Sequence, residues 1–223
     1  MGFLLIWDID GTLIQGRGMG RRAMDRAFLD LYGIPGGFNG INMAGGLDSL
    51  ILCDALSCHG IENRNHTEFF NKYCEHLRDE VQKLNDSVAS PGVIALLELL
   101  NKNGGFCNAL GTGNIEKGAR IKLEIDGLNR FFPTGGFGDE PMERWQVIEK
   151  AIFNSTVYFG TGFESENIYI IGDTPKDIEC GKRLSVKTIG TATGPYTMQQ
   201  LADCGADFVF SDLSDVHAFL EIF

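Results

Sequence analysis

The chain has 223 residues, of which 43% are hydrophobic and 22% are charged. This balance is typical of a soluble globular protein, and the length suits one domain of ordinary size with a smaller inserted piece. The formal net charge of -11, from 30 acidic and 19 basic side chains, argues against nucleic acid or an anionic membrane surface as a partner.

The N-terminal segment has neither a basic leader nor a long apolar run, which predicts a cytoplasmic protein without a membrane-spanning helix. The six cysteines contain no CxxC pair, and we expect them to be reduced and to pack as small apolar side chains. The four histidines show no metal-binding spacing. Any functional site is therefore expected among other residue types.

The first predicted element is a strand at residues 3–7, a continuous apolar run of the kind that is buried on both faces of a sheet. Three helical patterns follow one another at about 19–32, 47–59 and 66–84, with no strand pattern between them. Turn-forming residues flank this stretch on both sides. We therefore predict an all-helical domain of residues 16–87, inserted into a core made of residues 1–15 and 88–223.

After the insert, strand and helix patterns alternate. Further strands are predicted at residues 106–110, 168–171, 186–189 and 208–210. Helices are predicted near 90–104, 114–126, 140–153, 175–184, 197–203 and 212–221, the first of them capped by Ser90 with Pro91 in its first turn. This alternation predicts an α/β fold, a doubly wound and mostly parallel sheet of the Rossmann-like kind, covered on both faces.

Polar residues directly follow three of the predicted strands. In an open parallel sheet ligands bind at the carboxyl ends of the strands, so these residues are expected to meet at one edge. They are Asp8, Asp10, Gly11 and Thr12 after the first strand, Thr112, Gly113 and Asn114 after the second, and Asp173 and Asp177 after the third. Such a set of oxygen ligands and backbone amides suits Mg²⁺ as a cofactor.

Asp8 and Asp10 stand two residues apart where a strand ends, so both carboxylates can turn toward one ligand. Asp8 can attack phosphorus to form an aspartyl-phosphate, while Asp10 can donate a proton to the leaving oxygen and later activate water. A nearby like charge raises one pKa, which helps to keep Asp10 protonated. An isolated Asp-x-Asp is more often a solvated turn or a helix cap, but this pair is accompanied by the other strand-end groups.

The segment Trp-Asp-Ile-Asp-Gly-Thr-Leu at residues 7–13 closely resembles the signature of the haloacid dehalogenase-like hydrolase superfamily. Residues 112–114 are similar to the second motif of that family, and residues 172–177 to the fourth, in the same order and spacing. The helical insert resembles the family's cap, which closes over the substrate and shapes specificity. The resemblance therefore covers most of the chain.

The resemblance implies a Mg²⁺-dependent phosphatase in which Asp8 is the nucleophile, Asp10 the general acid and base, and Thr112 a hydroxyl that binds the transferring phosphoryl group. Asp8, the main-chain carbonyl of Asp10, and Asp173 would ligate the metal, with Asp177 as a further ligand or an anchor. The groups expected to bind the substrate are Gly11, Thr12, Gly113 and Asn114.

The third motif of the family, a Lys or Arg that bridges nucleophile and phosphate, is the least clear because the common Lys-Pro form is absent. Arg144 is the preferred candidate because it lies between a short extended stretch and a helix, at a suitable distance before Asp173. Lys150 is the alternative candidate.

Several functions stay open at this level. Asp10 favours phosphoryl chemistry over dehalogenation, but a sugar phosphomutase would use the same two aspartates, and a catalytically inactive module could keep the fold to bind a phosphometabolite. The glycines at 16–20 lack the third glycine of a dinucleotide loop. The expected partner is a small phosphorylated metabolite, and the expected assembly is a monomer or a homodimer.

Overall fold

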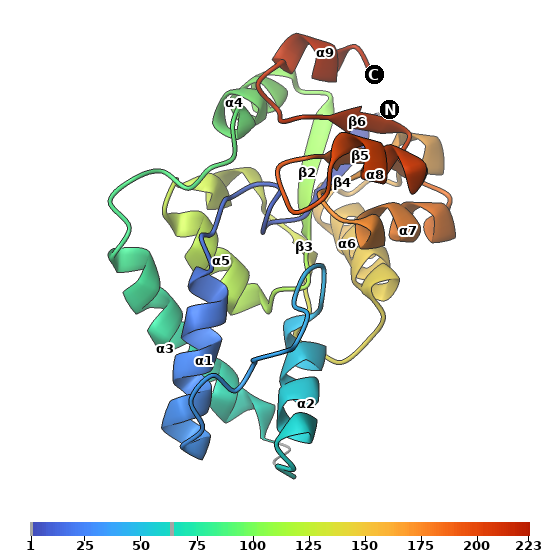
Figure 1. The fold of residues 1–223 in the computed structure, drawn as a ribbon. Helices are drawn as coiled ribbons and strands as arrows, with labels where there is room; N and C mark the ends of the chain where they lie inside the picture. Colours follow the sequence, from blue (N-terminus) through green and yellow to red (C-terminus); the bar gives the residue numbers. More distant parts are fainter. Residues whose placement is uncertain (1, 63–64) are drawn as a thin grey trace.

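Six parallel strands form one sheet in the order β3-β2-β1-β4-β5-β6 (Figure 1). The computed structural model describes residues 2–62 and 65–223. The strands of this part are β1 (Phe3–Trp7), β2 (Phe106–Gly111), β3 (Gly135–Gly136), β4 (Ile168–Gly172), β5 (Lys187–Thr191) and β6 (Phe208–Phe210). The sheet and its helices confirm the predicted α/β Rossmann-like fold.

Strand β1 lies at the centre and pairs with β2 on one side and β4 on the other. Its last residue, Trp7, is in register with Leu110 of β2 and Ile171 of β4. All three strands therefore end at nearly the same level, and the residues that follow them come out at a common edge.

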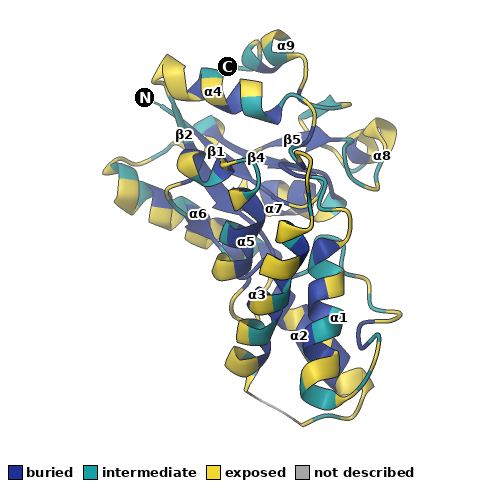
Figure 2. Ribbon diagram, turned by 90° about the vertical axis from the view of Figure 1, so that its left-hand side faces the viewer, coloured by how far each residue is buried: buried dark blue, intermediate teal, exposed yellow. Residues whose placement is uncertain are grey.

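The side chains of β1 alternate between two buried faces. Leu4 and Ile6 belong to one apolar cluster and Leu5 and Trp7 to the other. Helices α6 (Arg144–Phe159) and α7 (Pro175–Leu184) contribute to the first cluster, and α4 (Val93–Asn103), α5 (Glu116–Glu124) and α9 (Val216–Leu220) to the second. The strands are consequently buried between two layers of helices (Figure 2).

Short helical elements complete this part of the chain. They are α8 (Met198–Asp203) and the two 3₁₀ turns η1 (Leu128–Phe131) and η2 (Ser165–Asn167). Among residues 2–62 and 65–223, no helix combines the length and the apolar run needed to cross a bilayer.

Three helices follow β1 and lie together beyond one end of the sheet (Figures 1 and 2). They are α1 (Met19–Tyr32), α2 (Asp48–Cys58) and α3 (His66–Gln82), as the sequence pattern predicts. Their apolar side chains, such as those of Phe28 and Phe69, are continuous with the cluster on the Trp7 face of the sheet.

The two connections between the sheet and these helices run side by side. Gln15 N–H donates to the Val88 carbonyl (2.6 Å), and Ser90 N–H donates to the Leu13 carbonyl (2.9 Å). The chain therefore enters and leaves the helical part at one place. The predicted boundaries at 15/16 and 87/88 lie at this place, and the division into two domains stays a prediction.

The sequence pattern missed strand β3. It consists of two glycines, which have low β propensity and no apolar side chain to reveal a strand. Both are needed for close packing: a Cβ on Gly136 would lie 2.0 Å from the Val147 carbonyl oxygen of α6. The missing side chain of Gly136 thus allows α6 to approach the edge of the sheet, and that of Gly135 allows close packing against Leu110 of β2.

The predicted start of α4 at Ser90 and Pro91 is wrong. The helix begins at Val93, and its N-cap is Gly92 in the left-handed region at φ 81°. The C-terminal segment crosses at this point, since Leu213 N–H donates to the Pro91 carbonyl and a Cβ on Gly92 would lie 2.0 Å from the Leu213 carbonyl oxygen. A contact with a distant segment therefore decides where the helix starts.

A buried hydrogen bond joins β1 to β2, and we expect its loss to lower the stability of the fold. The Trp7 indole N–H donates to Asn108 Oδ1 at 2.9 Å. Replacement Asn108→Leu leaves the indole N–H buried without an acceptor, and the free energy of unfolding should fall by about 1 to 3 kcal/mol, measured by urea denaturation. In a Trp7→Phe background the same replacement should have a much smaller effect, and an equal effect in both backgrounds would contradict this account.

Candidate active site

The polar residues that follow β1, β2 and β4 meet at one edge of the sheet, as predicted. Asp8 continues the pairing of β1, because its N–H donates to the Ile171 carbonyl at 2.9 Å. Thr112 and Asp173 follow β2 and β4 directly and are buried. The geometry of the parallel sheet therefore brings residues 8, 112 and 173 together.

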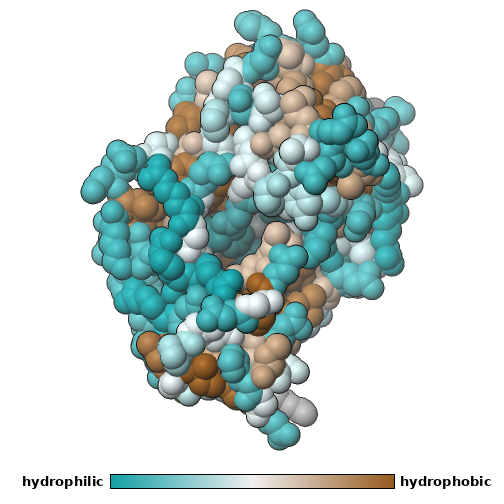
Figure 3. Space-filling model, viewed as in Figure 1, coloured by the Kyte–Doolittle hydropathy of each residue, from teal (hydrophilic) through white to brown (hydrophobic). Residues whose placement is uncertain are grey.

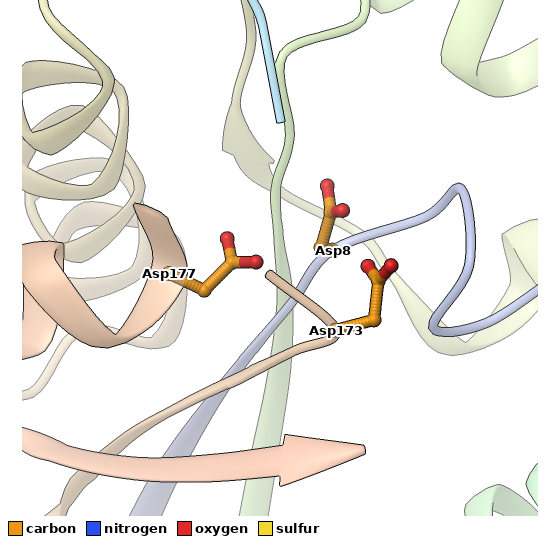
Figure 4. A group of neighbouring side chains, drawn as sticks. All are labelled: Asp8, Asp173 and Asp177. Carbon is orange, nitrogen blue, oxygen red and sulfur yellow. The ribbon is translucent and has the colours of Figure 1, made fainter. Parts of the chain in front are cut away.

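Three carboxylates form a tight buried cluster at this edge. Asp8, Asp173 and Asp177 each offer an oxygen, and these oxygens lie within 4.8 Å of one another (Figure 4). Burial raises the pKa of Asp8 to about 6, although the positive charge of Arg144 opposes the rise. Burial, with the negative charges of Asp8 and Asp177, raises the pKa of Asp173 to about 8.

Arg144 supplies a cation inside this cluster. Its Nη2 atom lies 3.0 Å from Asp8 Oδ1 and 2.7 Å from Asp177 Oδ1, and the side chain is buried. It is the first residue of α6, whose start is set by a capping box in which Glu143 N–H donates to Gln146 Oε1. Lys150 lies on the same helix but is half exposed and pairs with Glu140 at the surface. Of the two candidates, Arg144 is the one that contacts Asp8.

Asp177 is held on both of its oxygens. Oδ1 accepts from Arg144 Nε and Nη2, while Oδ2 accepts from the Thr174 backbone N–H (3.1 Å) and hydroxyl (2.8 Å) at the start of α7. These bonds orient Arg144 and cap the helix at the same time. The arrangement favours the anchoring role for Asp177 over direct metal ligation.

Residues 11 and 12 shape the environment of Asp173. The Thr12 hydroxyl donates to Asp173 Oδ1 at 3.2 Å, and the Thr12 side chain is fully buried. Gly11 has a left-handed φ of 87°, and a Cβ there would lie 2.4 Å from Asp173 Oδ2. The lack of a side chain at Gly11 therefore lets the backbone lie close to Asp173, whereas the side chain of Thr12 hydrogen-bonds to Asp173.

A second network surrounds Asp10. Asp10 Oδ2 accepts from Asn114 Nδ2 (2.8 Å) and from Lys122 Nζ (2.6 Å), and Lys122 also donates to Asn114 Oδ1 (2.6 Å). The Asn114 amide further donates to Thr112 Oγ1 at 2.8 Å, which leaves the Thr112 hydroxyl proton free for another acceptor. Burial alone would raise the pKa of Asp10, but the Lys122 ammonium and the hydrogen bonds from Lys122 and Asn114 hold it below its ordinary value.

Lys122 belongs to the site although no sequence motif contains it. It lies on α5 and is 4% exposed, and its neighbours Ile121 and Leu123 are buried as well. Lys122 stands three residues after the buried Ala119, so it falls on the apolar face of an amphipathic helix. A lysine at such a position needs a buried partner, and this signal was available from the sequence.

A cavity of about 470 Å³ opens between this edge and the helical insert. The space-filling view shows this side of the molecule hollowed between its two parts (Figure 3). The predicted residues that line the cavity are Asp8, Asp10, Gly11, Thr112, Gly113, Asn114, Arg144 and Asp173. Arg17, Met24 and Tyr73 of the insert line it as well, so a bound molecule would touch both parts.

Hydrogen bonds connect the start of α2 to the loop after β2. Asp48 N–H donates to the Gly113 carbonyl (2.7 Å), and Asp48 Oδ2 accepts from Ile115 N–H (3.0 Å). A Cβ on Gly113 would lie 1.9 Å from the Gly46 carbonyl oxygen. Gly113 therefore serves close packing between the two parts, in addition to its position at the cavity.

A family model described as haloacid dehalogenase-like hydrolase matches residues 5–191. The chain belongs to this family. The matched range contains the whole helical insert and every predicted site residue, so the resemblance seen in the short motifs holds over most of the chain. No curated protein sequence matches the hydrolase significantly.

Several solved structures share the fold of the chain. A structure described as a predicted phosphatase from Clostridium acetobutylicum has a TM-score of 0.72 at 17% identity, with 100% of each chain covered. One described as a predicted phosphoglycolate phosphatase from Haemophilus somnus has 0.70 at 20% identity, and one described as a β-phosphoglucomutase from Thermotoga maritima has 0.65 at 17%, covering 98% and 99% of each chain respectively. At these identities the likeness establishes the fold.

The environment of Asp48 predicts a pH dependence for the stability of the hydrolase. Burial raises the pKa of Asp48 to about 7, although Lys122 opposes the rise. The unfolded chain has an ordinary pKa of about 4, so between pH 4 and 7 the folded state binds more protons and loses stability as the pH rises.

Asp48→Asn keeps an acceptor for Ile115 N–H and removes the titrating group. The free energy of unfolding of the wild type should therefore fall relative to that of the variant as the pH rises from 4 to 7, by at most about 1.4 kcal/mol per pH unit. Urea denaturation at several pH values measures this difference, and parallel curves for the two proteins would contradict it.

Proposed function

We propose that the chain is a Mg²⁺-dependent phosphatase that hydrolyses a small phosphomonoester through an aspartyl-phosphate on Asp8. The observation that carries the proposal is the position of Asp8. Its carboxylate lies at the centre of the sheet edge, 3.0 Å from the Arg144 guanidinium and beside Asp173, and it lines the cavity together with Asp10. A nucleophile, a cation and a second carboxyl group thus face one space.

In the first step an Asp8 oxygen attacks phosphorus, the bond between phosphorus and the ester oxygen breaks, and Asp10 gives its proton to that oxygen. In the second step Asp10 takes a proton from water, the resulting hydroxide attacks phosphorus, and Asp8 leaves as a carboxylate with inorganic phosphate as the other product. The same carboxyl group serves as acid and then as base.

The proton on Asp10 depends on what is bound. Lys122 and Asn114 favour the ionised form, which is the form that takes a proton from water. The negative charge of a bound phosphoryl group opposes them and raises the proton affinity of Asp10 before the first step.

Arg144 and Thr112 are suited to hold the phosphoryl oxygens. The Arg144 guanidinium keeps the Asp8 carboxylate oriented. Its positive charge would neutralise part of the negative charge on the oxygens of a phosphoryl group bound beside Asp8. The Thr112 hydroxyl accepts hydrogen bonds from Asn114 and retains its own proton as a donor.

The residues at the edge also fit a magnesium ion. Asp8 and Asp173 offer oxygen ligands whose pKa values are raised, first by burial and then by the negative charges of the carboxylates crowded around them. Such crowding is relieved by a divalent cation, and the Asp10 carbonyl is the further ligand that we propose. A bound Mg²⁺ supplies charge neutralisation to the phosphoryl oxygens.

Phosphoryl transfer to a second hydroxyl, as in a sugar phosphomutase, would use the same residues. The shared fold with the Thermotoga maritima protein keeps this alternative open. The products distinguish the two functions, because a mutase converts a hexose 1-phosphate to the 6-phosphate, whereas the phosphatase releases inorganic phosphate.

The proposed nucleophile is tested by Asp8→Asn with p-nitrophenyl phosphate and Mg²⁺. The amide cannot attack phosphorus, so turnover should fall by at least about 10⁴-fold, while the thermal unfolding midpoint stays within a few degrees of the wild-type value. Lys150→Met, which changes a surface charge on α6, serves as a control and should keep full activity. An active Asp8→Asn variant would show that the nucleophile lies elsewhere.

The metal site is tested by calorimetric titration with Mg²⁺ in the absence of substrate. Asp173→Asn removes a ligand charge and should weaken binding by about 10-fold or more. Asp203→Asn replaces an exposed carboxylate on α8 and should leave the affinity unchanged. Equal Mg²⁺ affinity of the wild type and the Asp173→Asn variant would refute the site. In a separate activity assay, a chelator should abolish phosphate release by the wild type.

A further inference from the structure

Lys122 is a buried cation that enters the proposed reaction only through its charge beside Asp10. Its ammonium group is in contact with Asp10 and with Asn114, at 2.6 Å in each case, and the residue is 4% exposed. Burying an ammonium group is unfavourable unless it is paired, so the position must be held by these contacts. The pairing also removes conformational freedom from Asp10, which lies in the turn after β1 and is otherwise open to the cavity.

The contacts leave the two oxygens of Asp10 in different situations. Oδ2 accepts from Lys122 and from Asn114. Oδ1 has no hydrogen bond from any residue that the structure describes. It faces the backbone at Gly16, because a Cβ added to Gly16 would lie 3.3 Å from this oxygen. One oxygen is therefore fixed and the other is free to exchange a proton with a bound molecule.

The surroundings of Lys122 come from both parts of the chain. A Cβ on Gly20 in the first turn of α1 would lie 3.2 Å from Lys122 Nζ and 3.7 Å from the Tyr73 hydroxyl of α3. The Tyr73 hydroxyl is buried, lines the cavity and has no hydrogen-bond partner among the described residues. No side chain larger than glycine would fit easily at position 20, so the helical insert closes tightly over the ammonium group.

We propose that Lys122 is a positioning residue for proton transfer: it fixes Asp10 through Oδ2 and Asn114 through Oδ1, so that Asp10 Oδ1 faces the ester oxygen of the substrate. The proposal rests on the proposed function and deepens it. Lys122 acts through Asp10, and its importance therefore depends on how much the leaving group needs a proton. Esters of alkyl alcohols need one, whereas p-nitrophenolate leaves without it.

The test compares Lys122→Met with the wild type on an alkyl phosphate, such as glycerol 1-phosphate or another alkyl ester that the wild type hydrolyses, and on p-nitrophenyl phosphate. The measured quantity is kcat/KM, because it reports the steps up to formation of the aspartyl-phosphate and excludes its hydrolysis. We expect a loss of about 100-fold for the alkyl ester, the lower end of what general acid catalysis contributes, and a change within about 3-fold for p-nitrophenyl phosphate.

Lys117→Met is the matched control. Lys117 lies on the same helix and is exposed, with a hydrogen bond to Asn71, so its replacement makes the same chemical change outside the site. It should leave kcat/KM for both substrates unchanged. An equal loss for both substrates in Lys122→Met would show a merely structural role, and no loss for either would show that Lys122 has no part in the reaction.

A double-mutant cycle keeps the proposal testable if the single variant is unstable. In an Asp10→Asn background, Lys122→Met should cause no further loss of kcat/KM on the alkyl ester, because the group through which Lys122 acts is already gone. Lys122→Gln is the second single variant, since it retains a donor for Asp10 and should recover part of the loss. A further loss of 10-fold or more in the Asp10→Asn background would show that Lys122 acts directly and would overturn the proposal.

Failure of this proposal is distinguishable from failure of the proposed function. If the wild type hydrolyses neither ester, or if Asp8→Asn keeps its activity, the phosphatase assignment is wrong. If the wild type hydrolyses both esters and Asp8→Asn hydrolyses neither, the phosphatase assignment stands. The comparison of the two leaving groups then tests only the positioning role of Lys122.

Discussion

Repulsion among buried carboxylates is the constraint on which the site depends. Asp8, Asp173 and Asp177 are held close together in a place from which water is largely excluded, where like charges are costly. The Arg144 guanidinium lies between two of them and makes the arrangement possible. Removing the guanidinium is expected to be strongly destabilising, because the carboxylates would be left uncompensated, whereas replacing one carboxylate by its amide relieves part of the repulsion.

Much of the surrounding fold serves to put that guanidinium in place. Gly136 of β3 lets α6 lie close against the sheet edge, and the capping box at Glu143 makes Arg144 the first residue of the helix. The two aspartates at the end of β1 are then distinguished by their neighbours. Asp8 meets Arg144 on one side, and Asp10 meets Lys122 on the other. Two identical side chains thus acquire different chemistry from two different cations.

The parts of the site that were predictable are those set by regular geometry. Strand ends in a parallel sheet meet at one edge, so Asp8, Thr112 and Asp173 could be placed together from apolar runs alone. Lys122 could be recognised as a lysine on an apolar helix face, but its partner Asp10 could not be named, because the contact exists only after α5 has packed. The same holds for the start of α4, which depends on the crossing of Leu213, and for β3, which has no side chains to reveal it. Arg144 was predictable in part. The sequence offered Arg144 and Lys150 as candidate cations on one helix, and only the structure shows that Arg144 is buried and Lys150 is not.

The adjacent connections at residues 13–15 and 88–90 bear on how such a chain can diversify. Because the segment between them begins and ends at neighbouring points, its length and sequence can change while the register of β1 against β2 and β4 is kept. Mutations in the intervening helices alter the wall of the cavity, and mutations in the sheet alter the reacting groups. The two kinds of change can therefore accumulate separately during evolution, so that one set of reacting carboxylates can be presented to many different molecules.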